Sequence, residues 1–136
     1  MPTVHAIIGF GVTGRSVARY LLRNGIPCVV FDTRSPQPVA EEFRGIEVHW
    51  QIEQWPEARL GECLSDIGRL VVSPGLPLDL AILSVARTLK LPIVSDIDLF
   101  FEATGAPVIG VTGTNGKSTV VSLVGHIFNY LGQACG

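Results

Sequence analysis

Apolar residues along the chain follow two alternating patterns. Apolar-rich runs of four to six residues, typical of buried parallel strands, occur at 4–8, 27–32, 46–50, 69–73, 92–95 and 108–112, with 46–50 the weakest. Helical spacing of apolar residues predicts helices at 15–24, 79–90, 96–102 and from 117 onward. The alternation predicts an α/β protein with a Rossmann-like, doubly wound parallel sheet.

Two local signals support the predicted helix ends. Gly25 follows the first helical stretch and predicts its C-terminal stop, because glycine adopts the left-handed conformation that closes a helix. Ser95 and Asp98 have the spacing of a capping box, which predicts a helix beginning at residue 96. The alternative reading of Asp96 and Asp98 as a metal pair is weaker, because capping already explains the spacing.

A small-residue and proline stretch at 103–107 predicts a domain boundary. We expect residues 1–103 to form one domain and residues 104–136 to begin a second, with one strand, one loop and one helix. Because these few elements cannot bury a core, we expect the chain to stop partway through that domain. The last helix would then expose apolar side chains and favour self-association or local disorder.

Composition excludes several classes of protein. The 136 residues carry a net charge of −2, which argues against a nucleic-acid-binding domain, and 47% hydrophobic against 16% charged residues excludes a disordered chain. Cys28, Cys63 and Cys135 form no CxxC pair, which fits a reducing, cytoplasmic setting. The N-terminus has no signal-peptide pattern. Residues 118–136 lack charged side chains, but polar interruptions favour a buried helix over a membrane span.

The first chemical signal is a glycine-rich turn between a predicted strand and a predicted helix. Gly9, Gly11 and Gly14 match G-x-G-x-x-G, in which glycines permit a tight turn and close approach of an anion to the backbone. Asp32 ends the next strand, where a carboxylate can accept a hydrogen bond from a ribose or a base. The pattern predicts a nucleotide site without choosing NAD over other diphosphate ligands. A ligand-free turn is the alternative.

The second signal follows the strand predicted at 108–112. Gly113, Gly116, Lys117 and Ser118 form a variant phosphate loop, with Val111 where the strict pattern has glycine. Lys117 would meet the β- and γ-phosphates of a nucleoside triphosphate, and the Ser118 hydroxyl could bind Mg²⁺. Hydride transfer has no use for this loop, which argues against an NAD-dependent oxidoreductase. A nucleotide-binding regulatory module remains a further alternative.

Five motifs together resemble the MurD group of the Mur ligase family. The loop at 113–119 alone would fit any Mur ligase or folylpolyglutamate synthetase, whereas the N-terminal motifs point to the MurD group. The family's loop also lacks the early glycine. The motifs are G-F-G-V-T-G-R-S at 9–16, D-T-R at 32–34, S-P-G at 73–75, S-D-I-D-L-F at 95–100 and G-T-N-G-K-S-T at 113–119.

The resemblance implies a role for each motif. The first domain would bind UDP: Val12 and Thr13 would meet the diphosphate, residues 32–34 the uracil, and Ser73 and Gly75 the phosphates. The residues implied for the UDP-linked substrate are Gly11, Val12, Thr13, Gly14, Asp32, Thr33, Arg34, Ser73 and Gly75. Those implied for ATP are Gly113, Thr114, Asn115, Gly116, Lys117, Ser118 and Thr119, with Lys117 and Ser118 catalytic and Ser118 also a Mg²⁺ ligand.

The implied activity is ATP-dependent amide formation in peptidoglycan precursor synthesis. The carboxylate of UDP-N-acetylmuramoyl-L-alanine attacks the γ-phosphate to give an acyl phosphate, and the amine of D-glutamate then displaces phosphate. Lys117 and Mg²⁺ would neutralise charge while the protein positions the reactants. We expect no ligase activity from these 136 residues alone, because the other metal ligands and the D-glutamate site would lie beyond them.

Overall fold

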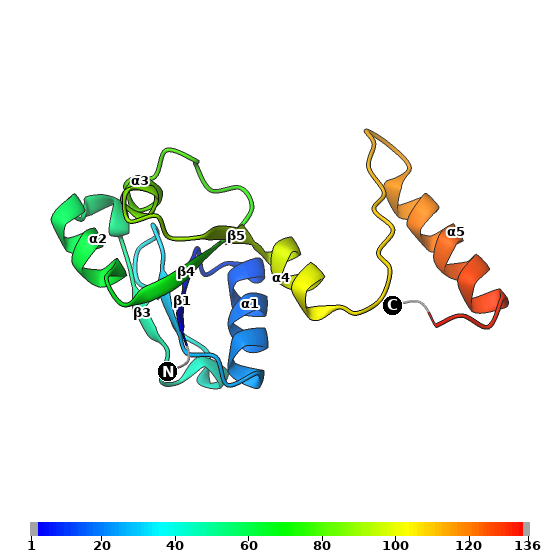
Figure 1. Cartoon of the computed structure of the whole chain (residues 1–136), viewed down its shortest axis with the longest axis horizontal. Coiled ribbons are helices and arrows are strands. Elements are labelled where there is room, and N and C mark those ends of the chain that lie inside the picture. The colour runs from blue at the N-terminus through cyan, green and yellow to red at the C-terminus, as the bar shows by residue number, and fades with distance from the viewer. Residues whose placement is uncertain (1–2, 135–136) are drawn as a thin grey trace. The chain divides into compact units, whose positions relative to one another are not determined.

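Residues 3–134 are described by a computed structural model, and the chain divides into two units, residues 1–103 and 104–136. The first unit is built on a five-stranded sheet in the order β3-β2-β1-β4-β5 (Figure 1). All four strand pairings are parallel, which confirms the predicted parallel sheet. The strands are β1 (Val4–Ile8), β2 (Cys28–Phe31), β3 (Glu47–His49), β4 (Ile67–Val72) and β5 (Ile93–Ser95).

Helices cover both faces of the sheet, as a doubly wound fold requires. In Figure 1, α2 and α3 lie on one face, and α1 and α4 lie on the other. The α-helices are α1 (Val12–Arg23), α2 (Glu57–Leu64), α3 (Ala81–Thr88), α4 (Asp96–Ala103) and α5 (Lys117–Tyr130), and two 3₁₀ turns are η1 (Glu41–Phe43) and η2 (Ile52–Gln54). The helix α2 was not predicted from the sequence.

Strand β1 shows how one apolar run serves two cores. Ala6 and Ile8 pack with α2 and α3, whereas Ile7 between them packs with α1 and α4. All three residues are fully buried, because successive side chains in a strand point to opposite faces. This is why β1 reads as a continuous apolar run rather than an alternating one.

Both predicted helix-end signals are present. At the end of α1, Gly25 has φ +67°, its N–H donates to Leu22 O at 3.0 Å, and the N–H of Ile26 donates to Leu21 O at 2.9 Å. These two bonds form a Schellman motif. At the start of α4, the Ser95 N–H donates to Asp98 Oδ2 at 2.7 Å and the Asp98 N–H donates to Ser95 Oγ at 3.2 Å. The capping box is therefore confirmed.

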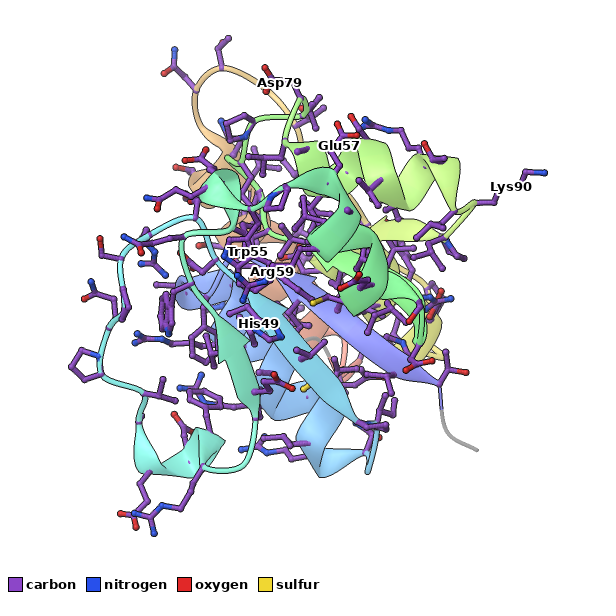
Figure 2. All side chains as sticks on the ribbon, turned by 90° about the vertical axis from the view of Figure 1, so that its left-hand side faces the viewer. His49, Trp55, Glu57, Arg59, Asp79 and Lys90 are labelled. Carbon is purple, nitrogen blue, oxygen red and sulfur yellow. The ribbon has the colours of Figure 1, made fainter. Side chains whose placement is uncertain are left out.

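Helix α2 is attached to the sheet through an aromatic side chain. The guanidinium of Arg59 lies 3.5 Å from the ring centroid of Trp55, and the ring of His49 lies 5.2 Å from the same ring (Figure 2). Leu60 and Leu64, four residues apart on α2, are completely buried. The helix thus combines an apolar face with a cation–π contact at its first turn.

The second unit differs from two of our predictions. Residues 108–112 form no strand, because a parallel strand is held by hydrogen bonds to neighbours and no described residue pairs with this segment. Helix α5 has no buried residue within the described part, so its apolar side chains are exposed, as expected from the few elements of this unit, and the reading of 118–136 as a buried helix is wrong for this chain. Among the described residues, no helix has the length and apolarity to cross a membrane. Cys135 lies outside the described residues.

Candidate functional site

The glycine turn lies at the carboxyl edge of the sheet, between β1 and α1. Gly9 has φ +91°, and a Cβ there would lie 3.0 Å from Leu76 Cδ1 and 3.2 Å from Ser73 Cβ. A Cβ at Gly14 would collide with the carbonyl oxygen of Gly9. The first and third glycines of the motif are therefore required for the turn and for its packing against the helix.

The middle glycine has a different environment. Gly11 is the N-cap of α1, and a Cβ there would meet nothing within 4 Å. The first intrahelical bond runs from the Arg15 N–H to Gly11 O at 3.0 Å, so the amides of 12–14 have no acceptor within the helix. No side chain of the described residues caps them. This helix end presents unused donors and the positive end of a dipole to an open surface, which suits a phosphate group.

Asp32 at the end of β2 is the one buried charged residue among those described, with 2% of its surface exposed. Its Oδ2 accepts the Phe10 N–H at 2.6 Å and Arg34 Nη2 at 2.7 Å. Its Oδ1 accepts the Arg34 N–H at 2.8 Å and Arg34 Nε at 2.9 Å. The carboxylate therefore joins the glycine turn to the loop after β2.

Two opposing effects determine the pKa of Asp32. Burial raises it, but the hydrogen bonds from the Arg34 side chain and from the Phe10 and Arg34 amides lower it further, so the pKa of Asp32 lies below its ordinary value of 3.8. Asp32 is therefore ionised at neutral pH. Its partner Arg34 keeps 49% of its side chain exposed, so one edge of the guanidinium faces solvent beside the turn.

The third predicted segment reaches the same edge from β4. The Ser73 hydroxyl donates to Gly9 O at 3.1 Å, and the Ser73 N–H donates to Ile8 O at 3.0 Å. Gly75 has φ +83° and open space at its Cβ position. Thr33 is partly buried between Asp32 and Arg34. The structure thus brings residues 11–14, 32–34, 73 and 75 to one sheet edge.

A groove of about 500 Å³ lies between α1 and α4 and begins at the same end of α1. Thr13 and Ser16 contribute hydroxyls, and Ile97 and Phe100 contribute apolar surface. Val12 and Thr13, whose amides are unused, both line this groove.

The phosphate loop belongs to the second unit. Gly113 and Gly116 have φ values of +151° and +76°, and Gly116 is the N-cap of α5. The first helical bond runs from the Val120 N–H to Gly116 O, which leaves the amides of 117–119 without helical acceptors. Thr114 and Asn115 form the exposed tip of the loop, and Ser118 and Thr119 are exposed in the first helical turn.

The Lys117 ammonium lies over this loop, where Nζ donates to Gly113 O at 2.6 Å. A cation and three unused amides around glycines in the left-handed region are a donor set that fits a phosphate chain. No group of three or more His, Cys, Asp or Glu side chains within residues 3–134 could hold a metal ion. The Ser118 hydroxyl is the one Mg²⁺ ligand that we predicted in this segment.

Sequence reasoning missed two contributors to the edge. The Phe10 amide holds Asp32, and nothing in the residue type signals this, because any residue has a backbone N–H. Gln51 follows β3 with φ +55°, and its N–H donates to Arg34 O at 3.1 Å. No sequence signal exists for a glutamine in this conformation.

Comparison with protein families gives a match over most of the first unit. The family described as Mur ligase MurD-like, N-terminal domain, matches residues 3–95. A UDP-N-acetylmuramoylalanine–D-glutamate ligase of Legionella pneumophila (strain Paris) is 42% identical over 127 residues, which is 92% of this chain and 28% of the relative. One of Psychrobacter cryohalolentis is 36% identical over 124 residues, 91% of this chain and 26% of the relative. The chain therefore spans little more than a quarter of such relatives.

Solved structures share the fold. The UDP-N-acetylmuramate:L-alanyl-gamma-D-glutamyl-meso-diaminopimelate ligase of Neisseria meningitides superposes with a TM-score of 0.63 at 23% identity, over 97% of this chain and 41% of that one. The UDP-N-acetylmuramate-alanine ligase of Thermotoga maritima gives 0.53 at 20% identity, over 96% and 30%. At this identity the likeness concerns the fold alone.

Proposed function

Because this chain belongs to the Mur ligase MurD-like N-terminal domain family, we propose that its first unit binds the UDP moiety of a UDP-linked muramoyl substrate. The observation that carries this proposal is the set of unused amides at the start of α1, open to solvent beside the exposed edge of Arg34. These amides and the helix dipole would hold the diphosphate, and residues 32–34 would lie beside the uracil.

The geometry of Asp32 favours UDP over NAD. Recognition of NAD by this type of turn uses an acidic residue after the second strand as acceptor for a ribose hydroxyl. Here both oxygens of Asp32 are already held by Phe10 and Arg34. Asp32 would therefore act by positioning Arg34 and the glycine turn, whereas Thr33 and the half-exposed Arg34 would contact the ligand.

We propose that the whole protein is the ligase that joins D-glutamate to UDP-N-acetylmuramoyl-L-alanine, as the names of its relatives state for those proteins. ATP with Mg²⁺ would supply the phosphoryl group that activates the substrate carboxylate. The amides of 117–119 would cradle the phosphates, Lys117 would exchange Gly113 O for a phosphate oxygen, and Ser118 would hold the metal ion. The free thiols of Cys28 and Cys63 suit a cytoplasmic enzyme.

These roles are divided between the units. Residues 1–103 would bind the UDP-linked substrate and residues 104–136 would begin the ATP-binding domain. The chain covers little more than a quarter of its relatives' length, and we propose that these 136 residues bind UDP without catalysing ligation. A turnover of ATP that depends on both substrates would contradict this expectation.

A thermal-shift panel tests the proposal, because a ligand that binds the folded state raises the melting temperature. UDP and UDP-N-acetylmuramoyl-L-alanine should raise the melting temperature, and NAD and NADP should not. Gly11→Val should abolish the UDP shift while the chain still folds, because Gly11 has an ordinary φ of −76° and open space where a side chain would meet the phosphate, and loss of the glycine N-cap costs only about 1 kcal/mol.

The matched control is Gly105→Val, which also places a side chain in open space but lies away from the glycine turn in sequence and outside the first unit. It should keep the UDP shift. A shift with NAD but none with UDP, or an unchanged UDP shift in Gly11→Val, would overturn the proposal.

A further inference from the structure

Gln51 has a backbone conformation that glutamine rarely adopts. Its φ is +55° and its ψ is +38°, in the left-handed region. Within residues 3–134, Lys90 is the one other non-glycine residue with a positive φ. The backbone of such a residue is strained, and the strain persists only where contacts of the residue offset it. Strain of this kind concentrates at ligand sites.

Lys90 has an ordinary structural explanation. It ends α3, where its N–H donates to Arg87 O at 3.0 Å and the N–H of Leu91 donates to Ala86 O at 3.0 Å. These bonds form a Schellman motif, and the Lys90 side chain points into solvent (Figure 2). Lys90 precedes β5 and therefore lies at the opposite edge of the parallel sheet from the glycine turn.

Gln51 has no comparable contact within the described residues that would offset its backbone strain. Its backbone N–H donates to Arg34 O at 3.1 Å, a bond that glycine would make equally well. Its side chain makes one hydrogen bond with the described residues, from Nε2 to Ser35 Oγ at 3.4 Å, which is long for such a bond. The contacts of the side chain therefore do little to offset the backbone strain.

The location of Gln51 points to a ligand. The chain at 49–52 runs beside 32–34, with the Asp32 N–H donating to His49 O at 2.8 Å and the Ile52 N–H donating to Asp32 O at 3.2 Å. The amide of Gln51 thus lies beside the loop assigned to the base. With Nε2 directed at Ser35, its Oε1 accepts no hydrogen bond from residues 3–134, while both oxygens of Asp32 are occupied.

We infer that Gln51 is a specificity-determining residue that accepts a hydrogen bond from the imide N–H of the uracil ring through Oε1. The inference rests on the proposed UDP site. A cytosine ring has an acceptor nitrogen at that position, so Oε1 would face a lone pair and repel it. Gln51 would thereby favour UDP over CDP, a distinction that diphosphate contacts alone cannot make.

Isothermal titration of the 136-residue chain with UDP and CDP tests the inference. Gln51→Ala removes the amide and keeps the strain, whereas Gln51→Gly removes both. We expect each variant to bind UDP about 3- to 10-fold more weakly, as the loss of one hydrogen bond implies, and to lose most of the preference for UDP over CDP. Gln51→Gly should also melt at a higher temperature than Gln51→Ala.

Lys90→Gly is the matched control, because it relieves the same type of strain at the opposite edge of the sheet. It should raise the melting temperature and leave both affinities unchanged. Wild-type UDP affinity and an unchanged UDP-to-CDP ratio in both Gln51 variants would overturn the inference while leaving the UDP site intact. Absence of UDP binding by the wild type would instead overturn the proposed function.

Discussion

The buried carboxylate of Asp32 should contribute strongly to the stability of the first unit. Replacing it in Asp32→Asn keeps the shape but turns one of two acceptor oxygens into an NH₂ group. Each oxygen accepts one backbone N–H and one guanidinium N–H from Phe10 and Arg34. In either orientation, the asparagine NH₂ therefore faces one backbone donor that has lost its acceptor.

The expected cost follows from that unpaired donor. A buried donor left without a partner costs about 1–3 kcal/mol, and the remaining bonds weaken because the acceptor is no longer charged. The half-exposed Arg34 side chain can turn to water, so it adds little. We expect Asp32→Asn to lower the free energy of unfolding by about 2–3 kcal/mol, or the melting temperature by about 10 °C or more.

Urea unfolding followed by tryptophan fluorescence measures this free energy of unfolding. Trp50 and Trp55 both lie in the first unit, and the ring centroids of Trp50 and Phe10 are 6.5 Å apart. Glu42→Gln is the control, since Glu42 forms an equally short pair with Arg19 but, unlike Asp32, is itself about half exposed, as is Arg19. It should match the wild type within error. A stability of Asp32→Asn within about 0.5 kcal/mol of the wild type would refute the reasoning, because it lies below the cost of one unpaired buried donor.

Four further predictions concern Asp32, the glycine turn, the phosphate loop and helix α5. The folded-state pKa of Asp32 is depressed, so its contribution to folding stability is fully present above about pH 4 and is lost as the pH falls through the folded pKa. The stability difference between wild type and Asp32→Asn should therefore narrow on acidification, which urea titrations at pH 3 and pH 7 would detect. Gly14→Ala should distort the glycine turn by collision with Gly9 O, visible as a melting temperature lowered by more than about 10 °C, whereas Gly11→Ala should lower it by only about 5 °C, the effect of a poorer N-cap. Lys117→Ala should weaken Mg-ATP binding by the whole protein at least about 10-fold while leaving UDP affinity intact, measured by titration calorimetry. Light scattering should find self-association of the 136-residue chain that weakens when Leu123→Ser and Ile127→Ser reduce the exposed apolar surface of α5; a monomer at all concentrations would contradict it.

The parallel sheet could be predicted because its strands are buried on both faces. Ile7 and Ile8 are apolar neighbours that point into different cores, and such runs are visible in the sequence. The capping box of Ser95 and Asp98 was equally readable, because both hydrogen bonds involve residues close in sequence. Local chemistry and short apolar periods are therefore the part of the fold that one sequence can reveal.

Elements stabilised by residues far away in the sequence were harder to predict. Helix α2 has only Leu60 and Leu64 as a buried pair, a signal too short to separate from a loop without knowledge of the α3 surface that it covers. The strand predicted at 108–112 was wrong for the opposite reason, since an apolar run becomes a strand only when another strand pairs with it.

The residues of the candidate site could be predicted, but the hydrogen bonds between them could not. Asp32 was singled out from its position after β2 and Arg34 from the resemblance to the Mur ligase motif, yet their mutual pairing and the bond to the Phe10 amide depend on how the loop closes. Gln51 could not be identified, because neither its left-handed conformation nor its place beside the loop that holds Arg34 and Ser35 is visible from residue type. Residue type gives candidates, whereas three-dimensional contacts decide which atoms remain available to a ligand.

Backbone amide chemical shifts recorded during titration with UDP would test the central claim most directly. We predict saturable shifts at the amides of Val12, Thr13 and Gly14, accompanied by Arg34 and Gln51, and no comparable shifts with NAD. Saturation of those amides by NAD, with UDP leaving them unchanged, would contradict the assignment of this helix end to a uridine diphosphate.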